Sequence, residues 1–159
     1  MWPQLADRAT YEYPEDGLLQ AFGVVQESDL RNPQHLDIHN MKCLLVTKHG
    51  AHTGTTFGKT NGLESFVRHY PPYGIEETSV EFAVLRYSED HPRFSEPGDS
   101  GSVILDRTGK IVGILTGGGG PMDSTAISYF TPFFDVDDQI KAQYPGIQLY
   151  PVVPTDNAT

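Results

Sequence analysis

The chain has 159 residues, of which 38% are hydrophobic and 20% charged, a composition typical of one globular domain rather than of a disordered segment. Its formal net charge is -10, and because an acidic surface repels phosphate backbones, the charge excludes nucleic acid as an expected partner. No apolar run approaches the roughly 20 residues that a membrane-spanning helix needs, so no membrane partner is expected.

The cysteine content gives a weak indication of compartment. Cys43 is the single cysteine, so no disulfide can form within the chain, whereas small secreted domains often carry several. The first residues show no basic stretch followed by an apolar stretch, the pattern of a signal peptide. These two observations favour an intracellular location. Cys43 itself lies in the apolar run 41–46 and is expected to be a small buried side chain.

The first forty residues contain few regular elements. Residues 18–25 predict a short strand with a bend at Gly23, and residues 29–33 predict a turn. His35 and His39 have the i, i+4 spacing of two zinc ligands on a helix. No third ligand is evident and the surrounding residues favour loop or strand, so we expect solvated loop histidines and no metal or other cofactor.

The rest of the chain is rich in strand signals. Apolar and β-branched runs bounded by glycine, proline or polar turns predict strands, whereas residues 88–93 predict a polar loop. We expect about six strands between residues 41 and 130, and the strand candidates are 41–47, the hairpin 48–58, 63–69, 81–87, 103–105, 111–115 and 124–130.

A serine lies between two glycines immediately before the hairpin 103–115. Gly98 and Gly101 allow backbone conformations that other residues avoid, so Ser100 and nearby amide N–H groups can be exposed. A serine presented in this way can act as a nucleophile with an oxyanion site beside it. The same tetrapeptide is also ordinary turn composition. The nucleophile elbow of α/β-hydrolases fits poorly, because Ser102 replaces its second glycine and a hairpin follows instead of a helix.

The last elements are a glycine run and a helix. Four glycines at 117–120 fit a strand edge that a peptide can pair with better than a phosphate cradle, because no lysine or helix start follows them. Thr131 as N-cap, Pro132 at the first helical position and Asp135 in the first turn predict a helix ending near residues 144–146. Its apolar face would carry Phe133, Val136 and Ile140.

Residues 97–102 together with 109–118 resemble the nucleophile segment of chymotrypsin-like (trypsin-like) serine proteases, the S1 family of the PA clan. The Gly/Thr pattern of residues 50–58 resembles the first hairpin of the second barrel in disulfide-poor members, where glycines serve tight turns and corners. The resemblance implies an all-β fold, a single antiparallel β-barrel with a C-terminal helix. It implies three regions: an N-terminal arm or remnant of an interdomain segment (1–40), the barrel with its helix (41–145) and a tail (146–159).

The resemblance also implies roles for individual residues. Ser100 would be the nucleophile, and the N–H groups of Gly98 and Ser100 would form the oxyanion hole. Phe94 would lie in one wall of the specificity pocket, although a packing aromatic is an equally open interpretation. The family position that Phe94 occupies is acidic in the trypsin type, so a preference for basic side chains is unsupported. The residues expected to pair with substrate backbone are Thr116, Gly117 and Gly118.

A complete triad needs a histidine base and an orienting acid before the serine. The family's sequence contexts for both are absent, and every upstream histidine belongs to the arm or to the serine-bearing barrel: His35, His39, His49, His52, His69 and His91. We therefore expect the C-terminal part of a serine endopeptidase, acting on a peptide or protein substrate but inactive alone and in need of a missing N-terminal barrel. One alternative is a non-catalytic peptide-binding module or pseudoprotease. Another is an unstable fragment that self-associates through an exposed apolar face.

Overall fold

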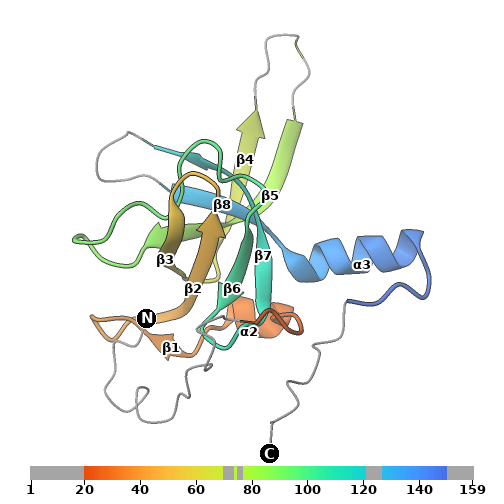
Figure 1. Cartoon of the computed structure of the whole chain (residues 1–159), viewed down its shortest axis with the longest axis horizontal. Helices are drawn as coiled ribbons and strands as arrows, with labels where there is room; N and C mark the ends of the chain where they lie inside the picture. Colours follow the sequence, from red (N-terminus) through yellow and green to blue (C-terminus); the bar gives the residue numbers. More distant parts are fainter. Residues whose placement is uncertain (1–19, 70–73, 75–76, 121–126, 150–159) are drawn as a thin grey trace, which may run out of the picture.

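The structure is a computed structural model and describes residues 20–69, 74, 77–120 and 127–149. Its strands and helices follow one another along the chain as Figure 1 shows. In chain order these elements are α2 (Glu27–Arg31), β1 (His35–Leu36), β2 (Lys42–Gly50), β3 (Gly54–Thr60), β4 (Glu64–His69), β5 (Glu77–Arg86), β6 (Val103–Asp106), β7 (Ile111–Gly119), β8 (Ile127–Pro132) and α3 (Phe133–Gln143).

Six of the strands close into one antiparallel barrel. The hydrogen-bonded order is β2-β3-β5-β8-β7-β6, and β6 returns to β2 with Thr47 opposite Leu105. Closure removes the unpaired edges that an open sheet would leave. β1 is added to β2, while β4 pairs with β5 in a ribbon that projects from the barrel (Figure 1). The predicted single β-barrel with a C-terminal helix is confirmed.

The barrel interior is filled by apolar side chains from β2, β5, β6, β7 and β8. Inward positions alternate along the strands, as a closed sheet requires, and the rings of Phe82 and Phe130 lie 5.9 Å apart in adjacent strands. The buried cluster consists of Val25, Leu30, Leu44, Val46, Phe82, Val84, Phe94, Ile104, Val112, Leu115 and Phe130. Val25 and Leu30 precede the first barrel strand, so this part of the arm contributes to the barrel core.

The segment before α2 differs from its prediction. Only Val24 forms a strand-like bridge, parallel to Ile111, so the described part of 18–25 is not a strand. Gly23 has a φ of +61°, which interrupts the extended backbone. The predicted turn at 29–33 is also wrong in part, because α2 covers Glu27–Arg31. Backbone bonds from Phe22 N to Gly109 O and from Ile111 N to Gly23 O, 2.9 and 3.0 Å long, join this segment to the β6–β7 turn.

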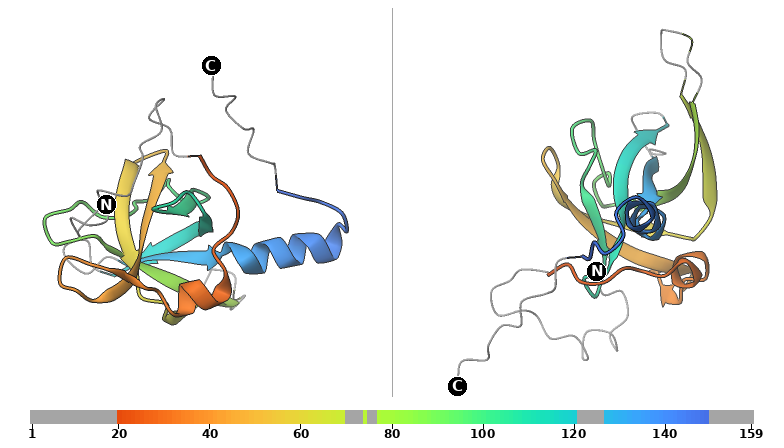
Figure 2. Two further views of the ribbon diagram at one scale, coloured as in Figure 1. Left: turned by 90° about the horizontal axis from the view of Figure 1, so that it is seen from below. Right: turned by 90° about the vertical axis from the view of Figure 1, so that its right-hand side faces the viewer.

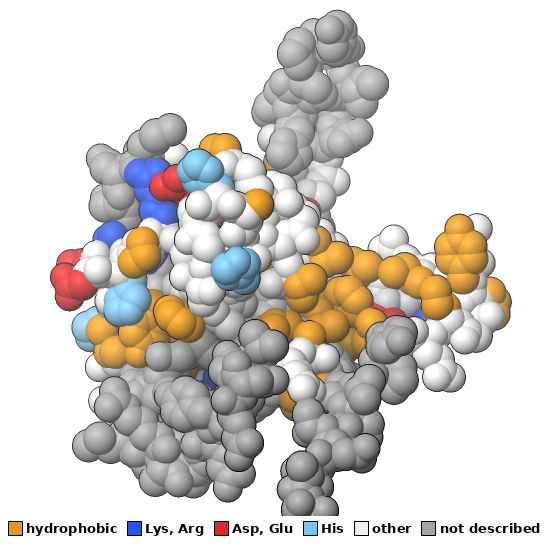
Figure 3. Space-filling model, viewed as in Figure 1, with side chains coloured by type: hydrophobic (Ala, Val, Ile, Leu, Met, Phe, Trp, Pro, Cys, Tyr) orange, Lys and Arg blue, Asp and Glu red, His pale blue; other side chains and the backbone are white. Residues whose placement is uncertain are grey.

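The C-terminal helix forms as predicted but begins differently. Thr131 remains in β8 opposite Ile114, and its Oγ1 donates to Glu81 Oε2 at 3.0 Å, so Pro132 with extended backbone is the N-cap. None of the helix residues is buried, and α3 projects from the barrel (Figure 2). In Figure 3 hydrophobic side chains run along α3 and onto the adjacent barrel surface. Among the described residues, no helix is long and apolar enough to cross a membrane.

Cys43 gives a simple probe of the closed barrel. Its side chain is 3% exposed, and burial raises the pKa of its thiol to about 11, with the nearby Asp37 carboxylate acting in the same direction. Because the thiolate is the reactive form, we expect no reaction with a thiol-specific disulfide reagent at pH 8 until the protein is unfolded by urea. Reaction in the native state at the rate of free cysteine would contradict this packing.

Candidate active site

Ser100 lies in a compact turn at the end of the β5–β6 loop, immediately before β6. Gly98 and Gly101 have φ angles of +103° and +88°, a region that side chains with a Cβ rarely adopt. The Asp99 N–H donates to the Glu96 carbonyl at 3.1 Å, and the Gly101 N–H donates to the Leu115 carbonyl of β7 at 2.7 Å. These bonds set the turn against β7 and leave the Ser100 side chain exposed.

The residue before the serine forms a buried ion pair. Asp99 Oδ2 lies 2.9 Å from Lys48 Nζ of β2, and both side chains are 0% exposed. Asp99 also accepts hydrogen bonds from the backbone N–H groups of His52 (2.8 Å), Thr53 (3.1 Å) and Glu96 (3.1 Å), and from Thr53 Oγ1 at 2.6 Å. One carboxylate therefore joins the serine turn to the β2–β3 hairpin.

The hydrogen bonds determine the charge of this carboxylate. Burial alone raises the pKa of Asp99, but the bonds from Thr53 and Lys48 and from backbone N–H groups outweigh it, so the pKa lies far below its usual value. Asp99 is consequently ionised whenever the protein is folded near neutral pH. Sequence reasoning missed the pair, and the available signal was a lysine inside the otherwise apolar β2 run, whose neighbours from Cys43 to Thr47 are all buried.

The backbone N–H groups around Ser100 differ in what they bond. Those of Asp99, Gly101 and Ser102 donate to carbonyl oxygens. Among the described residues, the N–H groups of Gly98 and Ser100 have no acceptor. These two N–H groups lie beside the exposed Ser100 hydroxyl and are available as donors. Such a pair of amide donors has the composition of an oxyanion site.

The Ser100 hydroxyl has a backbone partner and no imidazole partner. Its Oγ donates to the Thr116 carbonyl at 3.2 Å. No imidazole or carboxylate of the described part of the chain hydrogen-bonds this Oγ. His52 Nε2 instead lies 3.3 Å from Glu96 Oε2, and His49 Nδ1 lies 2.8 Å from Thr55 Oγ1.

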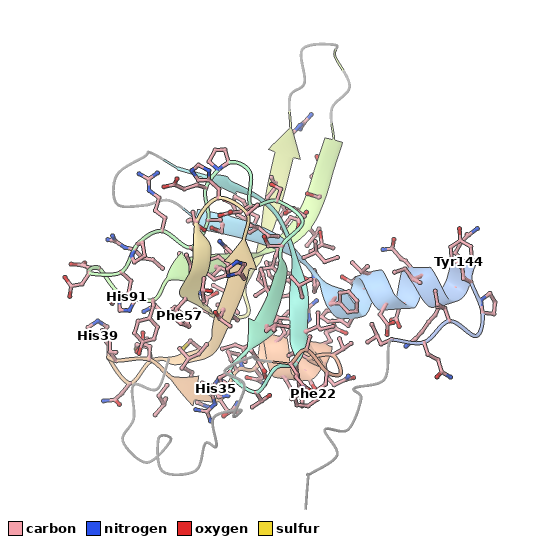
Figure 4. All side chains as sticks on the ribbon, in the orientation of Figure 1. Phe22, His35, His39, Phe57, His91 and Tyr144 are labelled. Carbon is pink, nitrogen blue, oxygen red and sulfur yellow. The ribbon has the colours of Figure 1, made fainter. Side chains whose placement is uncertain are left out.

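The remaining described histidines lie elsewhere. Figure 4 shows His35, His39 and His91 along one side of the barrel, near β1 and the β5–β6 loop. His35 belongs to β1, where its Nδ1 accepts from the Leu45 N–H at 3.4 Å, so it is a strand residue and not the predicted loop histidine. The described part of the chain therefore presents a serine without a base.

A cavity of about 410 Å³ opens beside Ser100, and we call it the serine cavity. Its lining comes from the serine turn and its preceding loop on one side and from β7 and β8 on the other: Arg93, Ser95, Glu96, Pro97, Ser100, Leu115, Gly117, Gly118, Gly119, Gly120, Ile127 and Ser128. The Oγ atoms of Ser95 and Ser128 are 2.7 Å apart across the cavity wall.

Phe94 is not in this wall. Its side chain is 2% exposed and belongs to the core cluster, so the packing interpretation holds and the pocket assignment is corrected. Its two neighbours in the loop, Arg93 and Ser95, line the serine cavity, whereas Phe94 packs into the barrel core. Gly117 and Gly118 do line it, whereas Thr116 contributes the carbonyl that accepts from Ser100.

The far end of β7 has one unpaired edge. On the β8 side the pairing continues through Gly117, Gly118 and Gly119, with a register shift between Leu115 and Gly117. On the β6 side it ends at Val103 opposite Ile114. Among the described residues, the segment after Leu115 therefore has no strand on the side of Ser100, which leaves backbone groups available to an added peptide strand.

Comparisons with known proteins give two partial matches. No family model matches the sequence. The chain is 28% identical over 136 residues to the structural polyprotein of Aura virus, an alignment that includes 79% of this chain and 11% of that protein. A structural match to the chymotrypsin of Cellulomonas bogoriensis has 26% identity and a TM-score of 0.43, and covers 63% of this chain and 46% of that chain.

The chain thus spans about a tenth of the polyprotein and less than half of the chymotrypsin. The order of the strands defines the fold. Six antiparallel strands close through β2 and β6, a glycine-flanked serine precedes the β6–β7 hairpin, and a helix follows the last strand. This chain therefore folds into a single closed six-stranded antiparallel barrel followed by a C-terminal helix.

Proposed function

We propose that this chain is the serine-bearing C-terminal part of a chymotrypsin-like serine endopeptidase, with Ser100 as nucleophile and negligible peptidase activity on its own. The observation that carries the proposal is the turn itself. Ser100 is exposed between the serine cavity and the unpaired edge of β7, and the flanking N–H groups of Gly98 and Ser100 have no acceptor among the described residues.

Each part of the site would have its own role in peptide hydrolysis. A peptide pairing with Thr116, Gly117 and Gly118 would carry one side chain into the serine cavity and bring its carbonyl carbon to Ser100. The oxygen of the tetrahedral adduct would accept from the N–H groups of Gly98 and Ser100. Among the described side chains, no imidazole lies in place to accept the hydroxyl proton, and loss of triad partners lowers rates by several orders of magnitude. A second barrel supplying histidine and aspartate is the partner that this chemistry requires.

Chemical rescue tests the nucleophile directly. A fluorophosphonate probe should label the chain slowly at neutral pH, and added imidazole should increase labelling at Ser100 about tenfold or more, because a free base can replace the missing general base in part. Labelling is measured by intact mass and located by peptide mapping.

Two serine variants of the same turn serve as controls. Ser100→Ala should abolish the rescued labelling. Ser102→Ala should keep it, since Ser102 Oγ only donates to the Asp99 carbonyl at 2.5 Å. Equal labelling of the wild type and of Ser100→Ala would overturn the assignment.

A binding module without catalysis is the second candidate, and the hydrogen bond from Ser100 Oγ to the Thr116 carbonyl favours it. That bond occupies the hydroxyl in the absence of an imidazole. A module of this kind would retain its peptide partners in Ser100→Ala and show no imidazole rescue in the wild type, so the same pair of proteins separates the two functions.

A further inference from the structure

Arg93 lies on the wall of the serine cavity and has no acidic partner among the described residues. Several described cations have an acidic partner: Arg31 contacts Glu27 and Glu64, and further pairs are Lys48–Asp99, Lys59–Asp37 and Lys141–Asp137. Half-buried Arg93 has neither a hydrogen bond nor an ion pair with any described residue. In a chain with 21 acidic and 11 basic residues, an unpaired guanidinium in a cavity is available to a ligand.

From this we propose that the serine cavity selects an acidic side chain of the bound peptide, with Arg93 as its counter-charge. The proposal rests on the proposed function for the site, and it adds the chemical class of the side chain that enters. A carboxylate suits a guanidinium because the planar fork of N–H donors matches its two oxygens. The Ser95 and Ser128 hydroxyls, 2.7 Å apart on the same wall, can supply a further donor.

The other charged group of the cavity already has a partner. Glu96 Oε2 lies 3.3 Å from His52 Nε2, and both side chains are well exposed, at 41% and 62%. Solvent and the imidazole therefore reduce the influence of this carboxylate. The other described lining residues are uncharged, and the glycines at 117–120 add no side chains that would obstruct a ligand. A basic side chain entering the cavity would be repelled by Arg93, and among the described lining residues only the carboxylate of Glu96 could offset that repulsion.

Peptide binding to Ser100→Ala tests the proposal without any chemical step. Acetylated, C-terminally amidated tripeptides differing only in Glu, Gln or Lys at the last position are titrated into the full chain, and the backbone amides of Ser95 and Gly118 are followed by NMR. The Glu peptide should bind about five- to tenfold more tightly than the Gln peptide, the advantage expected from a charge-assisted hydrogen bond in a partly solvated site. The Lys peptide should bind most weakly.

Two variants that each remove one positive charge identify the counter-charge. Arg93→Gln should erase the preference for Glu over Gln. Lys110→Gln should preserve it, because Lys110 also lacks a side-chain partner among the described residues but precedes the opposite end of β7.

Three outcomes would overturn the proposal: equal binding of the Glu and Gln peptides, an unchanged preference in Arg93→Gln, or equally tight binding of a peptide whose carboxylate is only its free C-terminus. A Glu preference together with no probe labelling of Ser100 would leave the cavity assignment standing and reject the proposed nucleophile.

Discussion

Replacing Lys48 with methionine is expected to lower the free energy of unfolding by about 4 kcal/mol, because breaking a buried ion pair leaves an unpaired charge in the interior. Lys48 and Asp99 are both fully buried, and methionine fills similar volume without supplying a donor. The remaining donors to Asp99, from the hairpin and from Glu96, cannot replace the lost cation. Urea denaturation followed by circular dichroism measures the loss.

Lys141→Met is the matched control for this experiment. It also removes one lysine from an ion pair, with Asp137, but this pair lies on the exposed surface of α3. Surface pairs at i, i+4 spacing contribute about 0.3–0.5 kcal/mol, so the control should lose no more than that. The double variant Lys48→Met with Asp99→Asn should recover part of the stability lost in the single variant. Equal losses for Lys48→Met and Lys141→Met would show that Asp99 does not depend on its buried partner.

The serine turn should respond to the same substitution. Asp99 connects the β2–β3 hairpin to the turn through several hydrogen bonds, so losing its counter-charge should loosen the N–H groups of Gly98 and Ser100. Hydrogen exchange at the hydrogen-bonded amides of the same turn, those of Asp99, Gly101 and Ser102, should become faster in Lys48→Met than in Lys141→Met under conditions where both remain folded.

Gly113→Ala is expected to destabilise the barrel by about 2–3 kcal/mol through overpacking. A Cβ at Gly113 would lie 2.3 Å from Phe130 Cδ2 and 2.5 Å from the Thr131 carbonyl oxygen of the paired strand. The backbone oxygen belongs to the β7–β8 ladder and cannot move without breaking it. The unfolding midpoint in urea is the measurement.

Gly117→Ala in the same strand provides the contrast. A Cβ there would have no protein atom within 4 Å, and the residue does not have a positive φ. Alanine reduces the conformational freedom of the unfolded chain, so Gly117→Ala should change stability by less than about 0.5 kcal/mol or raise it slightly. Similar losses for both variants would mean that the strand needs glycine for its backbone rather than for space.

The strands of the barrel could be predicted because their side chains carry the signal. β2, β6 and β7 are runs of β-branched and apolar residues between glycine turns, and each forms within a few residues of its predicted limits. β5 begins earlier than predicted, at Glu77, because its first half pairs only with β4 in the projecting ribbon and has little apolar pattern. Six of the seven strands from β2 to β8 form the barrel, consistent with the expected number.

The site was predicted less completely because its geometry depends on long-range contacts. The glycines around Ser100 marked the turn, but no local pattern shows that Lys48 reaches Asp99 across the barrel. Thr131 satisfies the usual preference for an N-cap, yet its pairing with β7 keeps it in a strand. Phe94 packs into the core while its neighbour Arg93 lines the cavity, because the direction of side chains in a loop depends on the backbone, which composition does not specify.

The closure of the barrel has a consequence for folding kinetics. β2 meets β6 only after β3, β4 and β5 have been synthesised and placed, so this ladder joins positions far apart in sequence, such as Thr47 and Leu105. Contacts of high sequence separation form late and slowly, since the chain entropy lost in closing the loop precedes the gain. Lys48 lies in the same ladder, opposite Ile104. We therefore expect the turn that presents Ser100 to acquire its shape late in folding, so that a partly folded chain would not display an organised nucleophile.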